Sequence, residues 1–214
     1  MKLYAAVPAY DGKVTIETAR SLCNEQVAAA LQGIELSIQF VPGGSLVTTV
    51  RDRVASDFLK SDADRLIFVD SDVSWELGDL LKLAHHPVDF VGGCYRYKQE
   101  PEGYPVQFLD KEELWADPAT GLLEVSALPA GFLCVSRAVF EQLQAAHPSR
   151  KYEHQGHQMH AYFWAPPGGG EDGMFCAEWK AIGGKVWLDP RFTLTHTGGN
   201  PDFTGNIGNW LRNR

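Results

Sequence analysis

The sequence predicts an α/β fold with a Rossmann-like, mostly parallel central sheet flanked by helices. Strand and helix patterns alternate early in the chain, with strands over 3–7, 34–41 and 65–69 and helices over 15–31 and 46–59. This β-α-β-α-β order implies parallel strands, because each helix returns the chain to the edge where the previous strand began. The last strand is a nearly continuous apolar run, which is typical of a strand buried on both faces.

Start and stop signals in the sequence support these elements. The first strand ends at Pro8, and the first helix carries apolar residues at helical spacing until Gly33 stops it. The second strand is closed by Pro42-Gly43-Gly44, and the second helix again has apolar residues spaced for one buried face. Ligands of such sheets bind beyond the carboxyl ends of the strands, so the loops after the strands are where a site is expected.

The second half of the chain is more mixed. Its predicted elements are strands over 89–97, 104–109, 122–125 and 191–195 and helices over 137–146 and 171–182. Residues 154–170 show no period and end in a Pro-Pro-Gly-Gly-Gly run, so we expect a mobile loop there. No repeat or linker divides the chain, and we expect a single domain over 1–214.

Composition narrows the class of protein. The 214 residues are 44% hydrophobic and 21% charged, which is ordinary for a globular domain. The net charge of −8 argues against a broad nucleic-acid-binding surface. No apolar run approaches the roughly 20 residues that cross a bilayer, and the N-terminus lacks a signal-peptide pattern. We therefore expect no membrane span and a cytoplasmic protein, in the host cytoplasm if the source is viral.

Asp70-Ser71-Asp72 directly follows the most apolar strand. A turn there can bring both carboxylates together, and hard oxygen ligands of this kind suit Mg²⁺ or Mn²⁺, which also bind phosphate oxygens. The alternative is a strand-end turn with two solvated aspartates. Asp-x-Asp is common, so its place after a buried strand is what favours a metal site.

Several further segments carry a resemblance when they are taken together with this motif. They are Arg51-Asp52-Arg53, Phe58-Leu59, 66–72, 91–95, 130–135, Gly170-Glu171-Asp172 and His196. In this order they resemble the core of GT-A glycosyltransferases, most closely family-2-like and small viral or phage-type members. The resemblance spans most of the chain. It implies one GT-A domain, with a nucleotide-sugar-binding half at about 1–98 and an acceptor-binding half at about 99–214.

The resemblance assigns the donor and metal residues. The matching positions for binding a nucleotide-sugar are Pro8, Tyr10, Asp11, Arg51, Asp70 and Ser71. Arg51 suits phosphate or base recognition because its guanidinium is planar and always charged; the alternative is a surface cation paired with Asp52 or Asp57. Mn²⁺ or Mg²⁺ would be held by Asp72, with Asp70 facing the ribose or the metal, and by His196.

The resemblance also assigns the chemistry of transfer. An inverting enzyme of this kind needs a carboxylate that takes the proton of the acceptor hydroxyl, and Asp172 matches that base, with Glu171 binding the acceptor. Because both open a predicted helix, helix capping is the alternative. Gly131, Trp164 and Lys98 are predicted on the acceptor side. Lys98 is equally well explained as a surface lysine.

The sequence leaves the identity of the nucleotide and of the acceptor open. UDP is favoured only by its frequency in the family, and the acceptor is either a glycan or a hydroxymethylated base in DNA, reached by a local groove of Arg96, Lys98, Arg150 and Lys151. A sugar-phosphate nucleotidyltransferase and a non-catalytic nucleotide-sugar-binding module are the competing functions. A helix would bring together three histidines spaced by three, His154, His157 and His160. Gly156 weakens such a helix, which disfavours a shared zinc site.

Overall fold

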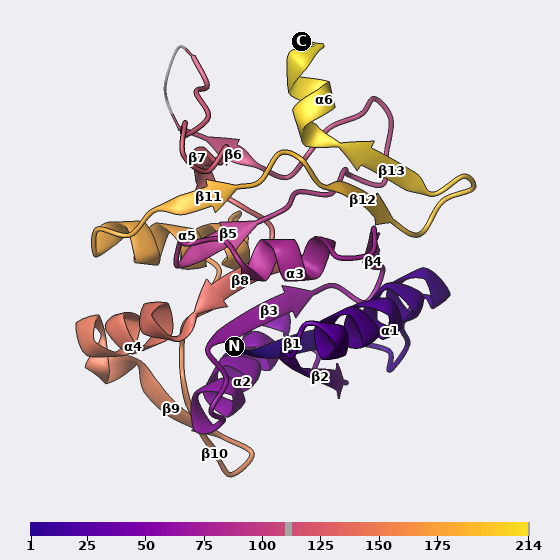
Figure 1. The fold of residues 1–214 in the computed structure, drawn as a ribbon. Coiled ribbons are helices and arrows are strands. Elements are labelled where there is room, and N and C mark those ends of the chain that lie inside the picture. Colours follow the sequence, from indigo (N-terminus) through magenta and orange to yellow (C-terminus); the bar gives the residue numbers. More distant parts are fainter. Residues whose placement is uncertain (110–112, 214) are drawn as a thin grey trace.

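The computed structural model describes residues 1–109 and 113–213, and one large sheet dominates it (Figure 1). The order of its strands is β2-β1-β3-β8-β5-β11-β7-β6. Their bounds are β1 (Lys2–Ala9), β2 (Glu35–Pro42), β3 (Arg65–Val69), β5 (Phe90–Gly92), β6 (Gln107–Phe108), β7 (Leu123–Ala127), β8 (Phe132–Ser136) and β11 (Val186–Leu188). The pairings make only β7 and β8 run against the other strands of this sheet. The predicted mostly parallel α/β sheet is confirmed.

Helices cover both faces of the sheet. Their bounds are α1 (Ile16–Leu31), α2 (Val47–Lys60), α3 (Asp79–Ala84), α4 (Arg137–Ala146) and α5 (Glu171–Ala181). Apolar residues of α1 and α3 pack with Ile67 and Val69 of β3, whereas those of α2, α4 and α5 pack with Leu66 and Phe68. Alternate residues of β3 thus meet opposite helix layers, which explains why the whole strand is apolar.

One edge of the sheet collects the polar loops. The strands β1, β3, β5 and β11 run in the same direction, so their carboxyl ends meet there. A smaller antiparallel sheet lies at this edge, formed by β4 (Val73–Trp75), β12 (Thr193–His196) and β13 (Phe203–Asn206), and followed by α6 (Ile207–Arg212) (Figure 1). Because His196 pairs with Val73, the C-terminal part of the chain returns to the loop after β3.

Two predicted strands are shorter than expected. The strand predicted over 89–97 stops at Gly92, and the one over 104–109 is reduced to Gln107–Phe108. After Gly93, the chain leaves the sheet because Tyr95 turns toward the loop after β3, where its hydroxyl donates to Asp70. The predicted helices over 137–146 and 171–182 are confirmed as α4 and α5.

The prediction of a mobile loop over 154–170 is wrong for its first part. The strands β9 (Lys151–His154) and β10 (His157–His160) form a hairpin that packs on α2. Gln155 and Gly156 both have positive φ (50° and 78°), as a two-residue hairpin turn requires. Downstream, Tyr162 and Phe163 are buried in the core.

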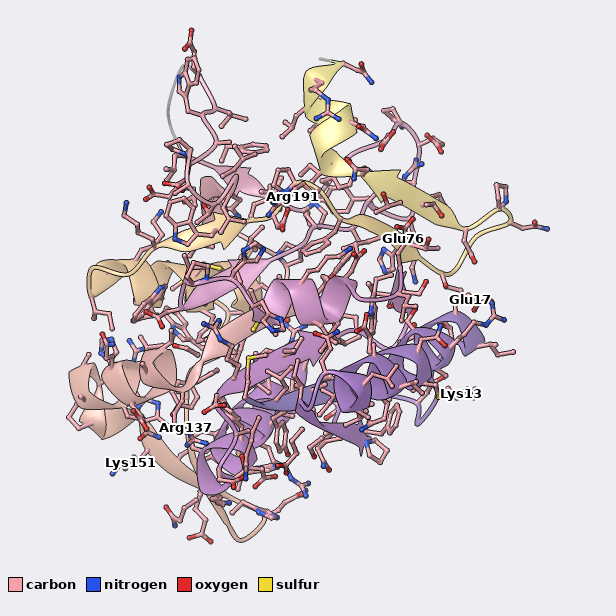
Figure 2. All side chains as sticks on the ribbon, in the orientation of Figure 1. Lys13, Glu17, Glu76, Arg137, Lys151 and Arg191 are labelled. Atoms are coloured by element: carbon pink, nitrogen blue, oxygen red, sulfur yellow. The ribbon has the colours of Figure 1, made fainter. Side chains whose placement is uncertain are left out.

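Arg137 joins two helices on the lower left of the molecule (Figure 2). Its guanidinium lies over the ring of Phe58, 4.7 Å from the centroid. The side chain donates to carbonyls at and after the end of α2, those of Phe58, Leu59, Ser61 and Ala63. It therefore satisfies carbonyls that a helix end leaves without partners.

We expect Arg137→Met to lower the free energy of unfolding by about 2–3 kcal/mol, because several carbonyls lose a charged donor. Urea titration followed by circular dichroism measures the loss. Lys60→Met is the matched control: Lys60 lies in the same helix end but pairs with Asp57 at the surface, so its loss should stay below about 0.5 kcal/mol. Equal effects of the two substitutions would contradict the capping role.

Candidate active site

The loop Asp70-Ser71-Asp72 is held by backbone hydrogen bonds from several parts of the chain. Asp70 N–H donates to the carbonyl of Gly131 (3.0 Å), and Thr197 N–H donates to the carbonyl of Asp72 (2.8 Å). Thr15, the N-cap residue of α1, donates to Ser71 (2.9 Å). These bonds fix the backbone of the loop, from which the two carboxylates point to different partners.

Asp70 faces a buried arginine. Arg51 of α2, with 5% of its side chain exposed, donates from Nη2 to Asp70 Oδ1 (3.3 Å) and from Nη1 to Glu171 Oε1 (2.6 Å), and its Nη1 also bonds Asp172. The other oxygen of Asp70 accepts from the Tyr95 hydroxyl (2.8 Å). Burial would lower the pKa of Arg51, but the three carboxylates raise it. The alternative in which Arg51 is a surface cation is therefore wrong.

Glu171 and Asp172 begin α5, but their carboxylates point into the site. Asp172 Oδ2 accepts from the Ala130 N–H (3.1 Å) while Oδ1 faces Arg51. Within the described residues, these bonds go to other elements and not to the first turn of α5, so capping is not the role that the geometry gives Asp172. Burial raises the pKa of Asp172 to about 6; Arg51 opposes this shift, and Glu171 and Asp70 add to it.

Asp72 lies beside a histidine and a lysine. His196 Nδ1 donates to the carbonyl of Arg96 (3.0 Å), which leaves the Nε2 lone pair 3.6 Å from Asp72 Oδ2. Lys98 Nζ bonds the same carboxylate oxygen. Burial would raise the pKa of Asp72, but His196 in its protonated form and Lys98 lower it to about 2. A pKa of about 2 keeps Asp72 ionised at neutral pH.

Asp72 and His196 fit a divalent ion. Their donor atoms converge, and the hydrogen bond at Nδ1 fixes the tautomer, as metal-binding histidines require. Asp70 is directed to Arg51 and Tyr95, so its predicted metal role gains no support from this geometry. Among the described residues no three His, Cys, Asp or Glu side chains form a metal cluster. Two protein ligands are sufficient where substrate phosphates supply the rest, as is usual for Mg²⁺.

A pocket of about 340 Å³ lies beside this loop. Four of the residues predicted to bind a nucleotide-sugar line it, namely Pro8, Tyr10, Asp70 and Ser71, and Asp72 joins them. Two do not: Arg51 is turned to the carboxylates, and Asp11 pairs with Lys13 in its own loop. A second wall was not predicted; it is formed by Gly43, Gly44, Ser45, Val47 and Val50. The sequence signal that could have predicted this wall is the pair of glycines after β2, because β2 ends at the same carboxyl edge of the sheet as β1 and β3.

A second pocket, of about 200 Å³, opens at Asp172. It is lined by Tyr97, Pro105, Val106, Gln107, Ala127, Leu128, Pro129, Gly170, Asp172 and Gly173. None of the predicted acceptor residues lines it. Lys98 lies against Asp72, and Trp164 is 38% exposed. A Cβ on Gly131 would lie 2.2 Å from Asp70 Oδ2, so this glycine makes room for that carboxylate.

The three histidines at 154–160 do not share one site, and two arginines of the predicted basic groove have acidic partners. His154 and His157 pair across the hairpin, whereas His160 is buried and bonds the carbonyl of His147 (2.8 Å). In the predicted basic groove, Arg96 pairs with Glu100 and Arg150 with Glu178. Both guanidinium groups thus already have an acidic partner.

Comparison with known proteins places this geometry in a fold class. No family model and no curated protein matches the sequence. Among solved structures, the catalytic domain of Drosophila β1,4-galactosyltransferase 7 in complex with xylobiose has a TM-score of 0.51 at 16% identity, over 87% of this chain and 64% of that one. A complex of a mutant of this enzyme with manganese, UDP-Gal and xylobiose gives 0.50 at 17% identity, over 100% and 73%. Staphylococcus aureus TarS 1–349 with UDP-GlcNAc gives 0.50 at 13% identity, over 88% and 56%.

The chain therefore has the GT-A fold of these glycosyltransferases. It spans less than two thirds of the Drosophila domain in the first comparison and of TarS. In the described residues no helix has the length and apolar character of a membrane span.

Proposed function

We propose that this protein is a metal-assisted, inverting glycosyltransferase that moves a sugar from a UDP-sugar to a hydroxyl acceptor. This proposal rests mainly on the ion pairs of Arg51 with Asp70 and Asp172, because Asp70 lines one pocket and Asp172 lines the other. A carboxylate with its pKa near 6, at the mouth of a pocket, is suited to accept a proton at neutral pH. The nucleotide-sugar and manganese complexes of proteins with the same fold support this assignment.

Different residues bind the nucleotide, hold the metal and take the acceptor proton in this proposal. In our proposal the nucleoside lies in the 340 Å³ pocket between Tyr10 and the glycines after β2. Asp72 and His196 would hold the divalent ion, which would supply charge stabilisation for the leaving diphosphate. The acceptor oxygen attacks the anomeric carbon as the bond to the diphosphate breaks, and its proton passes to Asp172. The donor half at about 1–98 thus supplies Asp72, and the acceptor half at about 99–214 supplies Asp172 and His196.

A glycan is the acceptor that we favour. The pocket at Asp172 offers the ring of Tyr97 and the amide of Gln107, and sugars are commonly bound by an aromatic face with amide hydrogen bonds. The Drosophila enzyme was solved with xylobiose. A hydroxymethylated DNA base is the second acceptor. A salt-sensitive gel shift with hydroxymethylated duplex DNA would favour it, because phosphate contacts weaken steeply as salt rises.

A donor panel tests the function. The full chain is incubated with UDP-, GDP- and dTDP-sugars, with and without Mn²⁺, and nucleotide release is measured. Slow, metal-stimulated release from one donor is the expected result. Pyrophosphate release from a nucleoside triphosphate and a sugar phosphate would instead show nucleotidyl transfer. Binding of a donor without any turnover, across a panel of oligosaccharide acceptors, would show a non-catalytic module.

The pH profile should report the proposed base. Because Asp172 must be ionised to take a proton and its pKa is about 6, we expect kcat/KM to rise about tenfold per pH unit below 6 and to level off above it. Initial rates between pH 4.5 and 8.5, with the donor saturating, measure this limb. A profile that is flat from pH 5 to 8 would contradict the assignment.

A further inference from the structure

Residues 95–98 contact the site at three successive points. The Tyr95 hydroxyl donates to Asp70 (2.8 Å), the Arg96 carbonyl accepts from His196 Nδ1 (3.0 Å), and Lys98 Nζ bonds Asp72 Oδ2. The first two contacts fix the backbone from which Lys98 projects. The ammonium group is therefore positioned by the same segment that orients His196.

The turn between β12 and β13 leaves space for this lysine. Gly198 has φ +144°, and a Cβ on it would lie 2.9 Å from Lys98 Nζ and 3.1 Å from both Cδ and Cε. Any larger residue would displace the lysine stem, besides being strained at this φ. The backbone at Gly198 thus forms one side of the passage through which Lys98 reaches Asp72.

Lys98 bonds the carboxylate oxygen that a divalent ion at this site would use. An ion bound by Asp72 Oδ2 and His196 Nε2 must lie next to both atoms, which are 3.6 Å apart. Lys98 Nζ already bonds that oxygen, and two cations cannot share it without strong repulsion. We propose that Lys98 is a built-in competitor of the metal: its ammonium neutralises Asp72 in the metal-free protein, and a divalent ion binds only by displacing it.

This role rests on the proposed metal-assisted function, and it makes Lys98 a determinant of metal affinity and not an acceptor residue. Displacement is feasible because the side chain is flexible and 35% exposed, so the ammonium can turn to solvent or to an anion that arrives with the metal. Exposed ion pairs are weak, so the competition is worth a modest factor in affinity.

Calorimetric titration with MnCl₂ alone, without nucleotide, tests the competition on the full chain. We expect Lys98→Met to tighten Mn²⁺ binding about three- to tenfold relative to wild type, and Lys98→Arg, which keeps the charge, to stay near wild type. Lys185→Met is the matched control, because Lys185 pairs with Glu124 (3.2 Å) away from the site and should leave the affinity unchanged. Asp72→Asn should abolish binding.

Several results would overturn the proposal: Lys98→Met binding Mn²⁺ no more tightly than wild type, Lys185→Met tightening it equally, or neither wild type nor Lys98→Met binding Mn²⁺. Thermal unfolding of each variant verifies that it is folded. The donor panel distinguishes a failure of the Lys98 proposal from a failure of the proposed glycosyltransferase function, since sugar transfer can be detected whether or not Lys98 competes with the metal. Conversely, tighter Mn²⁺ binding by Lys98→Met with no turnover of any donor would leave the competition intact and refute the transferase.

Discussion

Asp172→Asn is expected to lower kcat for sugar transfer by about 10²–10⁴-fold, the contribution that a positioned general base makes. Asparagine has nearly the same shape but cannot take the acceptor proton. Donor binding should be nearly unchanged, because Asp172 lines the second pocket and not the one beside Asp70. Transfer rates at saturating donor and acceptor, with calorimetric binding of UDP, measure the two effects separately.

Glu171→Gln is the matched control for this experiment. Glu171 is the neighbouring carboxylate and also bonds Arg51 (2.6 Å), but it does not line the pocket at Asp172. Because Glu171 lies outside that pocket, its substitution should leave kcat and the KM for acceptor close to wild type. Near wild-type transfer by Asp172→Asn would refute the base assignment, and a larger fall in kcat for Glu171→Gln would move the base to Glu171.

Arg51→Met is expected to lower the free energy of unfolding by about 3–5 kcal/mol at pH 7, the usual cost of removing one partner of a buried ion pair. Asp70, Glu171 and Asp172 would then face one another without a cation. Burial raises the pKa of Asp172, and Arg51 opposes that shift. Without Arg51 the pKa of Asp172 rises further in the folded protein, so protonation stabilises the variant. The deficit should therefore be largest at pH 7 and shrink toward pH 5.

Urea titrations at pH 5 and pH 7 measure both the loss and its pH dependence. Arg53→Met is the control, because Arg53 lies in the same helix but pairs with Asp57 at the surface (3.7 Å). Its loss should be below about 0.5 kcal/mol at either pH. If Arg51→Met cost less than about 1 kcal/mol, or if its deficit grew on acidification, the carboxylates would not depend on Arg51 as proposed.

The local sequence was sufficient to predict most regular elements and the edge at which the site lies. The run over 65–69 is β3 and the helix over 137–146 is α4, because strong periodicity and clear stop signals decide such elements locally. The sequence did not predict the hairpin over 151–160: a mobile loop was expected from residue 154, whereas Gly156 serves the two-residue turn of the hairpin. The short strands β4 and β13, which pair with β12 on either side, were also missed.

The grouping of the site residues required the order of the strands. Helices that link parallel strands begin at the carboxyl edge of the sheet, and Arg51 lies near the start of α2 and Asp172 at the start of α5. Their contact depends on β8 lying between β3 and β5, which places Ala130 and Gly131 beside the loop after β3. No local pattern specifies a sheet order. The donor pocket was partly predictable for the same reason, since Pro8, Tyr10 and the loop at 70–72 follow strands of one edge.

The sequence by itself determined the α/β class, the strand before Asp70 and the candidate residues, because periodicity and residue chemistry are local properties. Only the tertiary structure decided how the two aspartates differ. Asp70 meets Arg51 and Tyr95, whereas Asp72 meets His196 and Lys98. The physical reason is that each carboxylate takes its charge partners from segments distant in sequence, and the distances among those partners exist only once the sheet has formed.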